Sequence, residues 1–251
     1  MTDVSSRRLV LAAVLALVVV AVGTGLAHWA MTAGGEVTIE EATVETDSGV
    51  DLGATVYEPP GASADDPAPA VVLIHGYTGE RGTMTSFATE LAAEGYVAVA
   101  VDQPGHGESE PPAFADGWGG PAALSFTRSL ATVNESRVAL VGHSMGGFAS
   151  LAAAADQPDG YQSLVLVGST WGDVERVDPI PAANETFPRN MAVVFSRHDE
   201  FGPLMYDAAI PGNVHESEKL RAAFGTDRPV ERGRVYGSIA NGTARRLTSP
   251  Q

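Results

Sequence analysis

The chain has 251 residues, enough for one larger domain with a sizeable core, and it contains no cysteine. Disulfides, thiolate metal sites and a cysteine nucleophile are therefore excluded. Its 31 acidic and 15 basic residues give a net charge of −16, which would repel phosphate backbones and argues against nucleic-acid binding.

The basic residues are unevenly divided, because Lys219 is the only lysine and the others are arginines. An acidic, lysine-poor chain rich in alanine and glycine resembles the proteins of halophilic microbes, whose surface carboxylates keep them hydrated in high salt. A merely acidic protein from an ordinary environment is the alternative.

The first element is an apolar run from Leu9 to Ala27, which follows two arginines at 7 and 8. At 1.5 Å per residue, a helix of this length nearly spans the hydrocarbon core of a bilayer. The first acid after the run is Glu36, so the charge pattern predicts the N-terminus inside and the rest of the chain outside.

We therefore interpret residues 1–34 as a membrane anchor that crosses the cell membrane through residues 9–27. Residues 36–251 would then form an extracytoplasmic domain. A cleaved signal peptide is the alternative, because residues 25–27 (Gly-Leu-Ala) suit a cleavage site, and cleavage would give a secreted protein.

The rest of the chain alternates between strands and helices. Polar and apolar residues alternate on both sides of the turn at 47–49, which predicts an antiparallel hairpin over 36–61. Continuous apolar runs typical of buried strands then lie at 70–76, from 96 onward, and at 138–142, 161–169 and 191–196. Helices are predicted at 82–94, 120–132 and 145–155. This order predicts a mostly parallel, doubly wound α/β sheet preceded by the hairpin.

The sequence GHSMGG (142–147) joins one of these strands to the helix after it. A serine at such a sharp turn, here Ser144, is held in a strained conformation with its hydroxyl above the sheet. Side chains at Gly142 and Gly146 would collide with the neighbouring strand and helix. The N–H of Met145 points to the same place, at the positive end of the helix dipole.

Three further motifs stand in a matching order, and with them the chain resembles an α/β hydrolase over roughly residues 36–250. The motifs follow the third, fourth and seventh predicted strands: IHGY (74–77), DQPGHGES (102–109) and FSRHDEF (195–201). The resemblance is closest to membrane-anchored α/β hydrolases of halophilic archaea. It implies Ser144 as the nucleophile, Asp199 as the acid of a catalytic triad, and the backbone N–H groups of Tyr77 and Met145 as the oxyanion hole.

The resemblance implies a serine hydrolase that cleaves a small-molecule ester, thioester or peptide-like bond through an acyl-enzyme on Ser144, without cofactor or metal. Glu200, the next residue, is an alternative candidate for the triad acid. Asp102 also ends a strand, but this position is usually structural in the family. The other reading is a catalytically inactive α/β-hydrolase fold that serves as a binding module, or a remnant without its triad histidine.

A serine hydroxyl needs a base, and in this family the histidine follows the acid, just after the eighth strand. Only His215 follows Asp199, and it is predicted to open a helix over 215–224, where it would simply be a solvated first-turn residue. Residues 244–250 are the better candidate for strand eight. We therefore expect that the C-terminal helix and the histidine loop of the domain are missing from this chain, and that the histidine lies beyond Gln251. Loss of that helix would expose an apolar face of the sheet.

Overall fold

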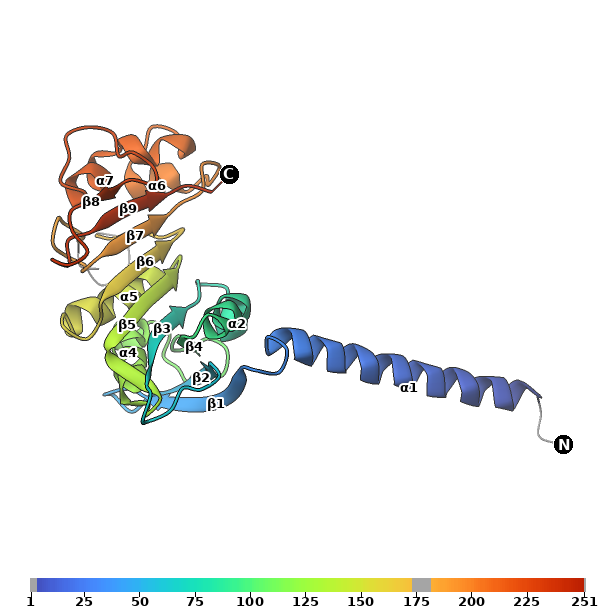
Figure 1. Cartoon of the computed structure of the whole chain (residues 1–251). Helices are drawn as coiled ribbons and strands as arrows, with labels where there is room; N and C mark the ends of the chain where they lie inside the picture. Colours follow the sequence, from blue (N-terminus) through green and yellow to red (C-terminus); the bar gives the residue numbers. More distant parts are fainter. Residues whose placement is uncertain (1–3, 173–181, 251) are drawn as a thin grey trace.

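The computed structural model describes residues 4–172 and 182–250 as a mixed sheet with flanking helices and a long N-terminal helix (Figure 1). The described strands are β1 (Thr38–Glu45), β2 (Asp51–Glu58), β3 (Ala68–Ile74), β4 (Val97–Val101), β5 (Val133–His143), β6 (Ser163–Val167), β7 (Met191–Val194), β8 (Val235–Tyr236) and β9 (Arg245–Thr248). The described helices are α1 (Val4–Met31), α2 (Thr85–Ala93), α3 (Ala115–Trp118), α4 (Gly120–Ser129), α5 (Gly146–Asp156), α6 (Gly202–Tyr206) and α7 (Glu218–Ala223), with short 3-10 turns η1 (Arg81–Met84) and η2 (Pro211–Glu216).

The strands form one sheet in the order β1-β2-β4-β3-β5-β6-β7-β9-β8. The hairpin β1–β2 is antiparallel and joins β4 in antiparallel fashion, whereas β4, β3, β5, β6, β7 and β9 run parallel. This arrangement confirms the predicted α/β-hydrolase fold, with its mostly parallel sheet and N-terminal antiparallel hairpin.

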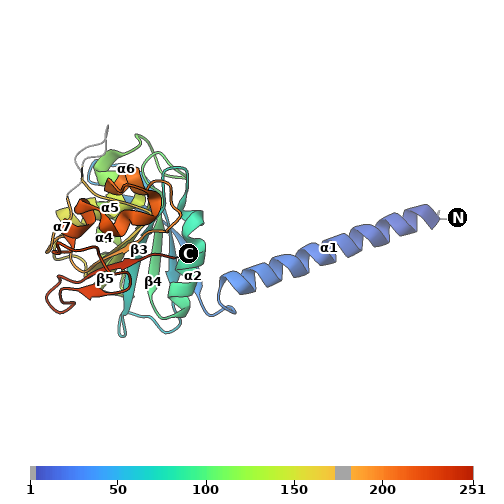
Figure 2. The same ribbon diagram turned by 90° about the horizontal axis from the view of Figure 1, so that it is seen from above.

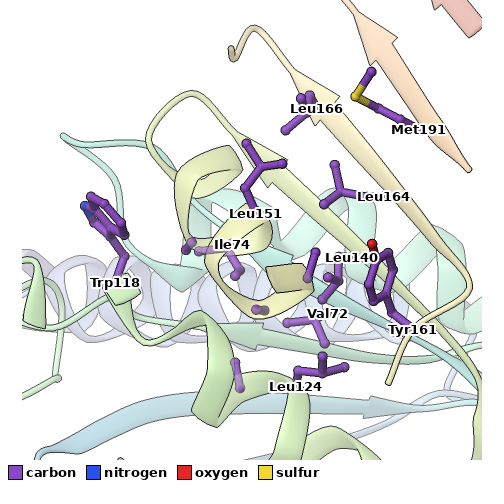
Figure 3. Close-up of a cluster of buried hydrophobic side chains, with 14 of the residues drawn as sticks. Val72, Ile74, Trp118, Leu124, Leu140, Leu151, Tyr161, Leu164, Leu166 and Met191 are labelled. Carbon is purple, nitrogen blue, oxygen red and sulfur yellow. The ribbon is translucent and has the colours of Figure 1, made fainter. Parts of the chain in front are cut away.

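Helices lie on both faces of the sheet, as Figure 2 shows, with α2 on one side and α4 and α5 on the other. The larger core fills the space between the sheet and α4, α5 and α7, and its members include Val72, Leu124, Leu140, Leu151 and Leu166 (Figure 3). A smaller core lies under α2. Strands β3 and β4 are therefore buried on both faces, which explains why their sequences are continuously apolar.

Beyond α2, the same face of the sheet is less covered. In β6 the residues alternate between buried Leu164 and Leu166 and partly exposed Val165 and Val167, and β7 shows the same alternation. The buried set packs against the core on the α5 side, so the partly exposed valines lie on the α2 side of the sheet.

Helix α1 extends away from the domain (Figures 1 and 2), and its residues 6–30 are exposed. Ser6–Ala30 is long and apolar enough to cross a membrane, although a signal sequence meets the same criterion. The connection to β1 is short and ordered: Val37 is buried, and its N–H donates to the Thr32 carbonyl at 3.0 Å.

The C-terminal part contains α6 and β8, which were not predicted, and one predicted helix differs in the structure. The helix predicted over 215–224 is broken into η2 and α7, so His215 lies in the 3-10 turn and does not open the helix. Ser217 caps the start of α7, because its Oγ accepts the Leu220 N–H at 3.1 Å. A serine at this position satisfies an unpaired helical N–H and thereby sets the start of the helix.

Candidate active site

The four sequence motifs meet at one edge of the sheet. Ile74 pairs with Gly142, Gly142 with Leu166, and Val167 with Val194, so the carboxyl ends of β3, β5, β6 and β7 lie side by side. The loops after β3, β4, β5 and β7 carry the motifs and leave the sheet at this edge. In open α/β sheets, ligands bind outside the carboxyl ends of the strands.

Ser144 occupies the turn between β5 and α5 with a left-handed backbone, φ +51°. Its N–H donates to the Val167 carbonyl at 2.9 Å, and its own carbonyl accepts the Gly147 N–H at 3.0 Å and the Ser169 hydroxyl at 2.6 Å. A left-handed conformation is unfavourable for serine, so these three hydrogen bonds hold a strained turn in place. The side chain is only half-buried, which leaves the hydroxyl within reach of a ligand.

The glycines around Ser144 are required by close backbone contacts. A Cβ on Gly142 would lie 2.1 Å from the Gly146 carbonyl oxygen, and a Cβ on Gly146 would lie 2.2 Å from the Ile74 carbonyl oxygen. Both distances are far below van der Waals contact. The two glycines therefore let α5 begin directly against β5 and β3, as the sequence predicted.

The loop after β3 places Tyr77 beside Ser144. A Cβ on Gly76 would lie 3.1 Å from the Ser144 Cβ, so the two chain segments touch. In the described part of the chain, neither the Tyr77 N–H nor the Met145 N–H has a hydrogen-bond acceptor. Both N–H groups are therefore available to a ligand that accepts hydrogen bonds.

Buried His75 fixes the conformation of this loop. Its Nε2 accepts the Gln103 N–H at 3.1 Å, so the neutral ring carries its proton on Nδ1 and donates it to the Gly76 carbonyl at 2.7 Å. Burial lowers the pKa of His75 below its usual 6.5, and the neutral ring satisfies both neighbours. The side chain thus ties the loop after β3 to the loop after β4.

Asp102 is the other carboxylate at a strand end, and its hydrogen bonds go to η1 and to the loop after β4. It is fully buried, and it accepts hydrogen bonds from the Arg81 side chain, the Arg81 N–H and the Glu108 N–H. These bonds use both carboxylate oxygens and hold η1 against the loop after β4. The contacts favour a structural role for Asp102.

Asp199 lies in the loop after β7, half-buried, and its Oδ1 accepts the Phe201 N–H at 3.0 Å. Its Oδ2 points toward Gly168 at the end of β6, since a Cβ on that glycine would lie 3.8 Å from Oδ2. Nearby Tyr206 is fully buried and donates its hydroxyl to the Ser169 carbonyl at 2.6 Å. Burial, and to a lesser extent the charge of Asp199, raise the pKa of Tyr206, so this hydroxyl remains protonated.

The histidine that shares neighbours with both Ser144 and Asp199 is His143. Its ring lies beside Gly76, as Ser144 does, with Nδ1 3.0 Å from the position of a Cβ there. The other side of the ring faces Gly168, as Asp199 does, at 3.9 Å from the corresponding position. His143 directly precedes Ser144 in the chain. The register of β5, β6 and β7 is what brings it near Asp199.

His215 is engaged elsewhere. Its Nδ1 accepts from the Arg232 guanidinium at 2.8 Å, and burial followed by the charge of Arg232 lowers its pKa. Within residues 4–172 and 182–250, no hydrogen bond joins either His215 or His143 to Asp199 or Ser144.

A family model described as "Serine aminopeptidase, S33" matches residues 65–232, which include Ser144, Met145, Tyr77 and Asp199. The chain belongs to this α/β-hydrolase family. As a member of the S33 family, it carries the strand order and the serine turn described above.

Curated relatives of this S33 family member include several hydrolases. It is 31% identical over 175 residues to Lipase 1 of Psychrobacter immobilis, a match that covers 69% of this chain and 52% of the lipase. It is also 36% identical over 100 residues to a putative carbamate hydrolase, RutD, of Klebsiella pneumoniae, covering 40% of this chain and 37% of that protein. The chain thus spans about half the length of the lipase and less of the other relative.

Among solved structures, the acetyl xylan esterase from Paenibacillus sp. R4 covers 86% of this S33 family member and is itself covered to 78%. The TM-score is 0.59 at 16% identity, so this likeness shows the fold alone.

Proposed function

We propose that this S33 family member is a serine hydrolase that cleaves an ester, thioester or peptide-like bond through an acyl-enzyme on Ser144. The observation that carries the proposal is the strained turn at Ser144 between two backbone N–H groups without acceptors, those of Tyr77 and Met145. Esters are the favoured substrates, because the relatives include lipases.

In this mechanism the Ser144 Oγ attacks the substrate carbonyl carbon and its proton passes to an imidazole. The oxyanion that forms accepts hydrogen bonds from the Tyr77 and Met145 N–H groups, each of which is worth about 3 kcal/mol in comparable sites. The tetrahedral intermediate then breaks its bond to the leaving group, which takes the proton from the imidazole. Water attacks the acyl-enzyme by the same route and restores Ser144.

Asp199 is our proposed acid, and its role would be to orient the imidazole and stabilise its protonated form. Of the histidines in the described part of the chain, His143 is the one whose ring shares one neighbour with Ser144 and another with Asp199. His215 is the competing candidate, but its Nδ1 is taken by Arg232. A ring whose pKa is lowered by burial, and further by that cation, would also be a weak base.

The test combines labelling of Ser144 by a fluorophosphonate with hydrolysis of p-nitrophenyl acetate by the full chain. We expect Ser144→Ala to abolish labelling and hydrolysis. Asp199→Asn should slow both rates by at least about 100-fold, because loss of the triad acid typically lowers rates by this much or more. Glu200→Gln, which changes the exposed neighbouring carboxylate, is the matched control and should retain the parent rates. Labelling that persists in Ser144→Ala would refute the proposal.

The base is assigned by His143→Ala and His215→Ala in the same assays. A loss confined to His143→Ala would identify His143, and a loss confined to His215→Ala would overturn our preference. If the chain neither labels nor hydrolyses although it is folded, the alternative holds: a catalytically inactive α/β-hydrolase fold that serves as a binding module, or a remnant without its triad histidine.

We also propose that α1 anchors the protein in the cell membrane with the domain on the extracytoplasmic side. The length and apolar composition of Ser6–Ala30 support this proposal, together with the two arginines that precede the apolar run. Membrane fractions should retain the full chain after alkaline carbonate extraction. Recovery of a shortened chain in the medium would show that the segment is a cleaved signal.

A further inference from the structure

Two large aromatic side chains stand exposed next to the serine turn. Tyr77 and Phe114 are 60% and 45% exposed, and their rings are stacked with centroids 6.1 Å apart and planes inclined by 16°. Tyr77 follows Gly76, which lies against Ser144, so the pair includes the residue whose N–H is a proposed oxyanion donor. Exposed apolar surface of this kind beside a reactive group is characteristic of ligand-binding sites.

A third ring, that of His106, contacts both members of the pair. His106, in the loop after β4, contacts Tyr77 edge-on at 5.9 Å and Phe114 at 6.2 Å, and it lies 5.5 Å from buried His75. The Nδ1 of His106 is 3.1 Å from the Pro104 carbonyl. The rings of Tyr77 and Phe114 therefore rest on a fixed base joined to the core.

The backbone conformation of Phe114 is a second, independent observation that favours a ligand-binding role for its side chain. Its φ is +68°, in the left-handed region that bulky residues adopt rarely and at an energetic cost. The strained backbone turns a large apolar side chain toward solvent, where burial does not offset the cost. Strained backbone of this kind concentrates at ligand-binding and catalytic sites.

We infer that Tyr77 and Phe114 form an aromatic platform that stacks on a planar ring in the substrate, which makes the favoured substrates esters with an aryl group near the carbonyl. This inference rests on the proposed function, because it is the Tyr77 N–H that would place the carbonyl beside the platform. Because both stacked rings are largely exposed, their outer faces are open to a further planar ring, and aromatic pairs gain affinity beyond that of buried area alone. A saturated ring of similar size would gain only from the buried area.

The experiment measures binding and not turnover, so that it is independent of the base. The full chain carrying Ser144→Ala, in lipid nanodiscs, is titrated with methyl phenylacetate and with methyl cyclohexylacetate. Dissociation constants come from saturation-transfer NMR of the ligand, with empty nanodiscs subtracted. We expect the aryl ester to bind about two- to tenfold more tightly than its saturated counterpart.

Variants locate the preference. Tyr77→Leu and Phe114→Leu, each added to Ser144→Ala, keep an apolar side chain and the backbone N–H, and should each remove the aryl preference. Tyr77→Phe should retain it. Phe87→Leu is the matched control, because Phe87 is 52% exposed on α2 and makes none of the described ring contacts. Chemical-shift dispersion of each protein confirms that it is folded.

Equal binding of the two esters, an aryl preference that survives both leucine variants, or no binding of the aryl ester would each overturn the inference. None of these outcomes bears on whether Ser144 is a nucleophile, which the labelling assay decides separately. Conversely, a chain that binds the aryl ester through the platform but fails to label would refute the proposed hydrolase and leave the platform standing.

Discussion

Replacing Gly146 by alanine is the most direct test of how the serine turn is built. The added Cβ would lie 2.2 Å from the Ile74 carbonyl oxygen and 2.5 Å from that of His75, both backbone atoms of β3 and its loop. Contacts below 3.0 Å essentially never occur for a real Cβ, so the start of α5 and the end of β3 must separate, by roughly 1 Å if the contact is to become an ordinary one. Ser144 and Met145 directly precede the first residue of α5, so a shift of the start of the helix would also move these two residues.

A displacement of about 1 Å at a reacting group typically lowers a rate about 100-fold. We therefore expect Gly146→Ala to slow fluorophosphonate labelling of Ser144 by about two orders of magnitude. Overpacking at a buried site should also lower the free energy of unfolding by about 1–3 kcal/mol, measured by urea denaturation. Gly212→Ala is the matched control, because its added Cβ meets only the Arg197 carbonyl oxygen, at an ordinary 3.5 Å. Parent labelling by Gly146→Ala would refute the reasoning, since the position of the Met145 N–H would then not matter.

Three other predictions concern the surroundings of the site and the surface. Ser169→Ala removes the hydroxyl that donates to the Ser144 carbonyl at 2.6 Å, and should lower the free energy of unfolding by about 1 kcal/mol and slow labelling; unchanged labelling would mean that the turn holds without this bond. Because burial lowers the pKa of His75, the unfolded chain binds more protons below pH 6.5, and stability present above that pH should be lost as the pH falls toward the folded-state pKa. Urea midpoints from pH 7.5 to 5.5 should therefore fall more steeply for the parent than for His75→Gln, and parallel profiles would contradict the assignment. Finally, screening of the −16 net charge should raise the melting temperature between 0.1 and 2 M KCl, and a melting temperature independent of salt would argue against a salt-adapted surface.

The sequence was sufficient to predict the serine turn because its requirements are local. Glycines at 142 and 146 are needed wherever a strand, a sharp turn and a helix follow one another closely, and the structure shows the contacts that exclude a Cβ. The hairpin is equally local, since Gly49 takes the left-handed conformation that its turn requires, φ +82°. Such features depend on neighbours in the chain, so the pattern of residues was enough.

Features that depend on distant neighbours could not be predicted. The approach of His143 to Asp199 depends on the register of three strands, and the Tyr77–Phe114 stack depends on how two loops meet. Arg245 is the clearest case: strand β9 was predicted, but not that this arginine faces inward and is only 1% exposed.

The Arg245 guanidinium donates to the Asn184 carbonyl, which lies in a loop, and to the Ala223 carbonyl, which lies at the end of α7. Burial lowers the pKa of Arg245 to about 10, so the side chain remains charged at neutral pH. Carbonyl oxygens that arrive from distant parts of the chain leave no mark in the sequence around β9. An alternating strand pattern alone would have assigned the inward positions to apolar residues.

The short joint between α1 and β1 sets the way in which the domain is carried. A flexible linker of six residues would let the domain wander by roughly 13 Å and turn in any direction. Here the Val37 N–H bonds to the Thr32 carbonyl and the Gly34 N–H bonds back to the Trp29 carbonyl, while the Val37 side chain is buried under α2. The connection therefore restricts the orientation of the domain relative to α1, which a flexible linker would not do. Whatever surroundings hold α1 therefore also restrict the direction in which the serine edge faces, and with it the side from which a substrate can approach.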